Sequence, residues 1–91
     1  MAIEVSIPTP LRTLTDNQDT VEIEAANIDA LIESLESKHP GMKERLLDEQ
    51  GTIRRFVNIY VNGEDVRFLE DLKTPLKESD EVSIVPAIAG G

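Results

Sequence analysis

The sequence of 91 residues predicts an α+β fold, in which a mixed sheet of four to five strands packs on one main helix. Three observations support this prediction. Two short segments near the N-terminus alternate apolar and polar side chains with the two-residue period of a half-buried strand. One amphipathic helical segment follows them. The second half of the chain then contains further strand segments separated by turns, so the chain forms one domain around a single modest core.

The first two predicted strands are residues 3–7 and 20–24. In the first, the apolar residues Ile3, Val5 and Ile7 alternate with polar ones, and a Pro-Thr-Pro sequence ends the strand. Residues 15–19 are polar and predict a turn. The two strands are therefore expected to pair as a hairpin at the start of the sheet.

The main helix is predicted to begin after Asn27, whose side chain can cap the free N–H groups of the first turn. Asp29 in that turn complements the helix dipole. Apolar residues then recur with the spacing of one helix face, at Ile28, Leu31, Ile32 and Leu35. The Lys-His-Pro-Gly sequence at 38–41 ends the helix, and a shorter helical turn is expected across 42–47.

The clearest strand is residues 56–61, in which Val57, Ile59 and Val61 share the side expected to face the core. Asn62-Gly63 follows, and this pair favours the positive φ angles of a tight hairpin turn. A short return strand is expected at 66–68.

Residues 69–76 are expected to be irregular, and a turn at 77–80 precedes the last strand at 81–85. The order is thus strand, strand, helix, strand, strand, strand. One mixed sheet that covers the apolar face of the helix is the economical packing for this order. This is the ubiquitin-like β-grasp arrangement.

The last strand leads into an apolar segment and two glycines, in the order Ala87, Ile88, Ala89, Gly90, Gly91. A glycine at the end of such a tail has no Cβ, which leaves its carboxylate unhindered and lets the chain enter a narrow groove of another protein. The predicted organisation is a folded domain at 1–86 and a flexible tail at 87–91. The residues alone leave a frayed terminus as the alternative.

Composition excludes several function classes. Eighteen acidic residues against nine basic ones give a net charge of -9, which repels phosphate backbones and anionic lipids, so no nucleic acid and no membrane is expected as a partner. The chain has no cysteine, which excludes disulfides, thiolate metal sites and a cysteine nucleophile. No signal sequence or membrane-spanning segment is visible. A cytoplasmic location is therefore expected.

Candidate catalytic chemistry is weak. His39 is the sole histidine and sits near a helix end, without the further ligands that a metal site needs. The carboxylates of Glu33, Glu36, Asp48 and Glu49 are interpreted as a solvated face and loop rather than an acid–base pair. No phosphate-binding glycine loop is present. The sequence therefore predicts no catalytic residues, no metal site and no enzyme activity of its own.

A docking face for a partner protein is predicted on the side of the sheet away from the helix. Tyr60 and Val85 lie there by strand alternation, with Phe56 beside them, and an exposed apolar group of this kind suits a protein interface. Arg54 and Arg55 form the only adjacent basic pair. They are interpreted as a solvated loop, with an acidic partner as the alternative.

Several segments together carry a family resemblance. They are Val5-Ser6-Ile7-Pro8-Thr9 with Leu11-Arg12, Glu44-Arg45-Leu46, Arg55 to Asn62 with Glu64 to Phe68, and Pro86 to Gly91. Over nearly its whole length the chain resembles the ubiquitin-like sulfur-carrier family of the ThiS and MoaD type. Within that family it is most similar to carriers of thiocarboxylate-dependent cysteine biosynthesis. The small subunit of molybdopterin synthase and the thiamin-pathway carrier are the alternatives.

The resemblance implies a protein cosubstrate without catalysis of its own. An adenylyltransferase and sulfurtransferase related to ubiquitin-activating enzymes would use ATP to adenylate Gly91, and sulfide or a persulfide would then displace AMP to leave a thiocarboxylate. Ala87, Ile88, Ala89 and Gly90 would thread into partner sites. The implied partners are a cysteine synthase that uses pyridoxal phosphate and a metal-dependent peptidase that releases cysteine, while the carrier binds no cofactor. A ubiquitin-like modifier joined to lysines, or an interaction module with an idle tail, remain alternative functions.

Overall fold

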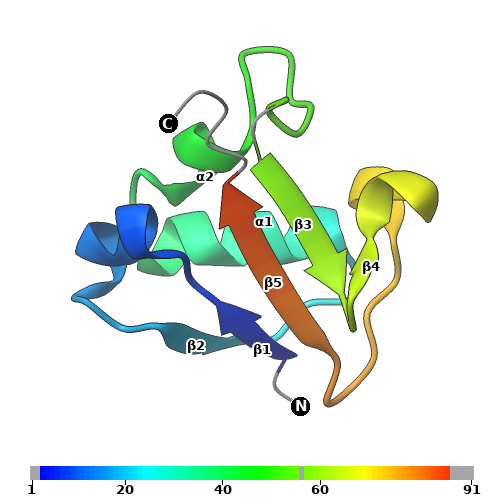
Figure 1. Cartoon of the computed structure of the whole chain (residues 1–91), viewed down its shortest axis with the longest axis horizontal. Coiled ribbons are helices and arrows are strands. Elements are labelled where there is room, and N and C mark those ends of the chain that lie inside the picture. The colour runs from blue at the N-terminus through cyan, green and yellow to red at the C-terminus, as the bar shows by residue number, and fades with distance from the viewer. Residues whose placement is uncertain (1–2, 56, 87–91) are drawn as a thin grey trace.

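The computed structural model describes residues 3–55 and 57–86, which form one five-stranded mixed sheet with the main helix α1 (Ile28–Lys38) packed across one of its faces (Figure 1). The strands are β1 (Ile3–Ser6), β2 (Thr20–Ile23), β3 (Val57–Val61), β4 (Glu64–Asp65) and β5 (Glu81–Pro86). Their order across the sheet is β2-β1-β5-β3-β4. β1 and β5 run parallel, and the other neighbours run antiparallel. The predicted β-grasp arrangement is confirmed.

The strand register follows the alternation in the sequence. β3 pairs with β5 so that Ile59 lies opposite Ile84, and both side chains are buried against α1. Val5 of β1 lies opposite Val82 of β5 and opposite Val21 of β2. The apolar residues of every long strand therefore share one face, and burial of that face is the main stabilising term of the sheet.

α1 begins and ends where the sequence predicts. The Asn27 Oδ1 accepts a hydrogen bond from the Ala30 N–H at 2.8 Å, and the His39 N–H donates to the Leu35 carbonyl at 2.6 Å. Its four predicted core residues, Ile28, Leu31, Ile32 and Leu35, are no more than 1% exposed. The short helix α2 (Met42–Leu46) follows after Gly41, whose φ of 99° is costly for residues with a Cβ.

The connection between β1 and β2 is more structured than predicted. Residues Thr9–Thr15 form a 3₁₀ helix, η1, which places Leu11 in the core. Thr15, predicted in a polar turn, is fully buried, and its hydroxyl donates to the Gln18 carbonyl at 2.9 Å. The prediction of a simple turn at 15–19 is thus wrong in part, because the side chain of Thr15 closes the turn from inside.

The predicted return strand at 66–68 is also wrong. β4 contains only Glu64 and Asp65, and Val66–Phe68 form a 3₁₀ helix, η2. The Asp65 Oδ1 accepts a hydrogen bond from the Arg67 N–H at 2.9 Å, which caps η2 and stops the strand. A second short 3₁₀ helix, η3 (Asp71–Lys73), lies within the segment predicted to be irregular.

Candidate partner-binding site at the end of the last strand

β5 ends beside the start of β3. Pro86, the last residue that the structure describes, lies opposite Val57. The predicted tail residues Ala87, Ile88, Ala89, Gly90 and Gly91 lie outside the described residues. The boundary at residue 86, the flexible tail and the reacting carboxylate of Gly91 therefore stay predictions, and the site considered below is the folded surface from which the chain continues toward Gly91.

The predicted docking face is partly assembled by the sheet. Tyr60 is half-buried and Val85 is 43% exposed, and both alternate with core residues of β3 and β5. Tyr60 lies opposite Ser83 and Asn58 lies opposite Val85, so Tyr60 and Val85 are diagonal neighbours on the face away from α1. In Figure 1, α1 lies behind β5 and this face is turned to the viewer. Phe56 lies outside the described residues, so its place on the face stays a prediction.

Sequence reasoning missed Phe68. Within the described part of the chain it is the most exposed large apolar side chain, at 87%. As part of a return strand, Phe68 would share the core-facing side with Val66, because residues two apart lie on one face. The 3₁₀ helix instead has three residues per turn, which separates the two side chains. The signal available in the sequence was Asp65, a short acidic side chain two residues before Arg67.

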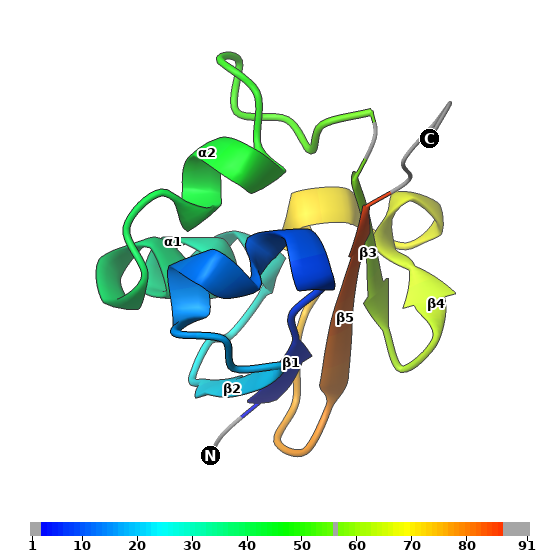
Figure 2. The same ribbon diagram turned by 60° about the vertical axis from the view of Figure 1, so that its left-hand side comes forward.

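Arg67 holds η2 against the start of β3. Its Nη1 donates to the Asn58 Oδ1 at 2.8 Å, and its Nη2 donates to the carbonyls of Arg54 and Val57, each at 2.8 Å. The planar guanidinium suits this forked set of acceptors. Figure 2 shows η2, the helical turn after β4, beside the start of β3 and the end of β5.

Both residues of the basic pair are exposed, and Arg54 also holds its loop to α2. The Arg54 Nε donates to the Glu44 carbonyl at 2.9 Å, and the Arg54 N–H donates to the Leu46 carbonyl at 3.0 Å, so Arg54 ties its loop to α2. Arg55, the next residue, is exposed. Arg54 is therefore an exposed loop residue, as predicted, and in addition it binds two carbonyls of α2.

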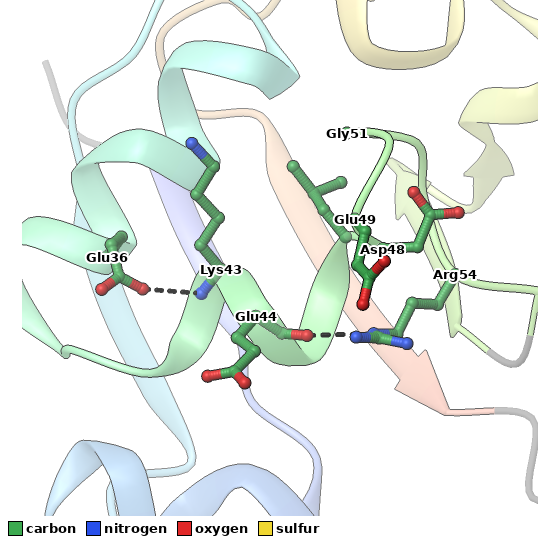
Figure 3. A pocket seen from close by; sticks show the side chains of 8 residues that line it. Glu36, Lys43, Glu44, Asp48, Glu49, Gly51 and Arg54 are labelled. Carbon is green, nitrogen blue, oxygen red and sulfur yellow. Dashed lines mark hydrogen bonds between the residues drawn. The ribbon is translucent and has the colours of Figure 1, made fainter.

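Three of the four carboxylates that the sequence singled out line a surface hollow of 540 Å³ between α1, α2 and the following loop (Figure 3). The Glu36 carboxylate accepts from the Lys43 N–H at 2.9 Å and caps α2. Asp48 accepts from the Thr52 hydroxyl at 2.7 Å and from two backbone N–H groups, which holds the pKa of its carboxyl below the ordinary value. These groups serve as local caps and loop ties.

Glu33, the fourth of these carboxylates, lies in α1 and forms an ion pair with Lys43. The hydrogen bond to Glu33 raises the pKa of the Lys43 ammonium. Across residues 3–55 and 57–86, no three side chains of the ligating types gather closely enough to hold a metal ion. In the same residues, no helix has the length and apolar character needed to cross a membrane.

The β-grasp sheet, with its last strand leading toward a Gly-Gly sequence, defines the class of ubiquitin-like carrier proteins. The sequence profile of the ThiS family matches residues 5–91, and the chain belongs to this family of ubiquitin-like sulfur carriers.

Two of the relatives cover all or nearly all of the chain, and a third covers most of it. The chain is 47% identical to the sulfur carrier protein CysO of Mycobacterium tuberculosis over 93 aligned residues, covering 100% of both chains. CysO of Amycolatopsis orientalis, solved in a complex with BexX, superposes with a TM-score of 0.93 at 47% identity, covering 99% of this chain and 100% of that one. The small archaeal modifier protein 3 of Haloferax volcanii is 36% identical over 66 residues, covering 72% of this chain and 71% of its own. The chain is thus a CysO homologue, which supports a sulfur-carrier role.

Proposed function

We propose that this protein carries sulfur as a thiocarboxylate on Gly91 and delivers it to cysteine biosynthesis. The observation that supports this proposal is the full-length similarity to sulfur carrier proteins named CysO, together with a ThiS-family match that continues through Gly91. In this proposal the folded body binds the partner enzymes and the last residues react in their active sites.

The proposed chemistry begins with adenylation. The Gly91 carboxylate attacks the α-phosphate of ATP in an activating enzyme, and pyrophosphate leaves. Sulfide then attacks the acyl carbon, and AMP leaves with the electron pair of the carbon–oxygen bond. The product is a C-terminal thiocarboxylate. A glycine at this position lets the carboxylate reach a buried centre, where proximity and orientation supply much of the rate.

The partners, in this proposal, supply all of the catalysis. The activating enzyme binds ATP, and a cysteine synthase holds the pyridoxal phosphate on which the thiocarboxylate sulfur reacts. In that synthase the sulfur would add to the β-carbon of an aminoacrylate formed from an activated serine, which gives a cysteinyl adduct of the carrier. A metal-dependent peptidase would then hydrolyse the adduct, release cysteine and restore the Gly91 carboxylate. The carrier itself is a cosubstrate without a bound cofactor. The carboxylate of Glu36 caps α2 and that of Asp48 binds within the following loop, which agrees with this division.

Intact-mass measurement tests the proposal. The protein is incubated with the activating enzyme of the same organism, ATP and sulfide. The expected result is a mass increase that corresponds to one sulfur in place of one oxygen, lost in a variant without Gly91. The activating enzyme is first shown to be active on a carrier that it is known to adenylate. An unchanged mass of this protein with that active enzyme would overturn the proposal. Transfer of the sulfur to a cysteine synthase, rather than to a molybdopterin synthase large subunit or a thiamin-pathway acceptor, then tests the pathway.

A second candidate function is conjugation to proteins, because one relative of this chain is named a small archaeal modifier protein. In that case the activated Gly91 would form an amide with lysine side chains of target proteins. Peptide mass spectrometry of the native host distinguishes the two functions. Target lysines that carry the C-terminal peptide of this chain, Glu78 to Gly91 after cleavage at Lys77, and that lose it in a Gly91-deleted strain would favour the modifier. Absence of such lysines beside a detectable thiocarboxylate would favour the carrier.

A further inference from the structure

The exposed ring of Phe68 lies on a segment that is held in place. Arg67, the preceding residue, joins η2 to the first strand residues of β3 by hydrogen bonds to Val57 and Asn58. Val66, on the other side of Arg67, is fully buried. An apolar side chain on such a turn stays in water at a cost in free energy, and its orientation is restricted by its anchored neighbours. This fixed presentation suits a partner that buries the ring.

The residue before Phe68 is bonded to the predicted docking face. The Asn58 side chain that accepts from Arg67 lies opposite Val85, which is 43% exposed. Arg67 and Asn58 thus link the segment that carries Phe68 to the strand pair that carries Val85.

The number of residues after Pro86 limits how far from the folded domain an enzyme that acts on Gly91 can lie. Five residues separate Pro86 from the carboxylate of Gly91. A fully extended segment of that length spans at most about 17 Å. An enzyme that encloses Gly91 must therefore lie within that distance of Pro86, and Pro86 pairs with Val57, to which Arg67 is bonded. Such an enzyme comes close to the start of β3, to which Arg67 anchors the segment that carries Phe68.

We propose that Phe68 and Val85 form the docking surface for the adenylating enzyme that acts on Gly91, which takes the phenyl ring into an apolar pocket with a basic rim. The basic rim is inferred from the net charge of -9. Arg67 acts as a positioning residue. This inference rests on the proposed function, since it assumes that Gly91 is the reacting residue.

The test compares Phe68→Ala with Leu69→Ala as the matched control. Leu69 is also an exposed apolar residue, 41% exposed, but it lines a hollow of 350 Å³ together with Val61 and Asn62, and Phe68 does not line that hollow. The two variants therefore remove neighbouring apolar side chains that face different surroundings.

The measurement is ATP–pyrophosphate exchange with the activating enzyme of the same organism, at several concentrations of each full-length carrier. Phe68→Ala should raise KM about 30-fold, as expected for loss of a central aromatic contact, and should leave kcat unchanged. Leu69→Ala should leave KM within about twofold of the wild-type value. Thermal unfolding of both variants checks that the fold is kept, and an exposed ring predicts no loss of stability for Phe68→Ala.

The outcomes separate this inference from the proposed function. Equal KM values for the wild type and Phe68→Ala would overturn the docking surface while the carrier function stands. An equal rise of KM in Leu69→Ala would also overturn it, because the effect would then not be specific to Phe68. Absence of exchange with the wild-type carrier, in an enzyme shown to form adenylates, would overturn both proposals.

Discussion

At the scale of single residues, Arg67 links η2 to the start of β3, a role that the sequence analysis assigned to no residue. Its guanidinium bonds two carbonyls and one amide oxygen, on Arg54, Val57 and Asn58. Asp65 caps the N–H of the same residue. The orientation of Phe68 and the start of β3 therefore depend on one side chain, although neither charge nor position marked it in the sequence.

Arg67→Ala is expected to lower the free energy of unfolding by about 1–3 kcal/mol, because three acceptors lose a charged donor. Arg67→Lys should restore only part of this, since one ammonium cannot copy the planar fork. Urea unfolding measures both. Arg45→Ala, at an exposed position of α2, is the control, and its change should stay within about 0.5 kcal/mol. Full stability in Arg67→Lys would show that the fork geometry is unimportant.

Asp80 is a second residue whose contribution to stability can be measured by a single substitution. Its Oδ2 accepts from the Lys77 N–H at 2.8 Å and its Oδ1 from the Asn62 side chain at 3.0 Å, which holds the pKa of its carboxyl below the ordinary value. A pKa lowered in the folded state contributes stability above the unfolded pKa, about 3.9. That contribution is lost as the pH falls through the lower, folded value.

Asp80→Asn should therefore reduce stability at neutral pH and flatten the dependence of stability on pH below about 4. Urea midpoints measured from neutral pH down to about pH 3 compare the variant with the wild type. A variant curve that keeps the full acid slope of the wild type would assign the acid sensitivity to other carboxylates, such as Asp48, whose pKa is also lowered.

At the scale of elements, α1 and β3 were predictable because each is specified by several agreeing local signals. α1 has its cap at Asn27 and an apolar stripe, and β3 has alternation followed by a positive-φ turn at Asn62-Gly63. The outer-face positions of Tyr60 and Val85 follow from the same alternation. The sequence therefore predicted the sheet, the main helix and the exposed position of Val85, which is half of the proposed docking surface.

The 3₁₀ helices were not predictable in the same way. η2 depends on one carboxylate of Asp65 reaching a backbone N–H, and η1 depends on the buried hydroxyl of Thr15. Each involves a few residues, so no apolar period has room to develop. The sequence predicted a strand at 66–68, and that prediction gave no indication that Phe68 would be the most exposed large apolar residue of the described chain.

Thr15→Val tests how η1 is held. Valine keeps the volume but leaves the Gln18 carbonyl without the hydroxyl donor, which should lower the free energy of unfolding by about 1–3 kcal/mol. Thr13→Val, at an exposed position of the same 3₁₀ helix, is the matched control and should change stability by less than about 0.5 kcal/mol. Equal effects in chemical denaturation would mean that the hydroxyl of Thr15 does not hold the turn.

At the scale of the whole molecule, the acidic surface favours encounter with a basic partner. Association of opposite charges is accelerated at low ionic strength and slowed by salt, because salt screens the field. Stopped-flow binding to the activating enzyme should therefore show an association rate that falls at least about tenfold between low and high salt. If salt changes the dissociation rate and leaves the association rate unchanged, the charges act through direct contacts in the complex and not through long-range attraction.

The proposed division between a docking body and a reacting tail predicts opposite kinetic signatures for changes in each part. Two glycines inserted after Pro86 would leave Phe68 and Val85 in place, so the KM for the carrier should stay near the wild-type value. The Gly91 carboxylate would, however, be displaced by up to about 7 Å along an extended path. Since small misplacements cost large factors in rate, kcat for pyrophosphate exchange should fall about 100-fold or more. Phe68→Ala should do the reverse and raise KM alone. If the insertion raises KM with an unchanged kcat, the tail itself supplies the binding energy, and the folded surface serves only to carry it.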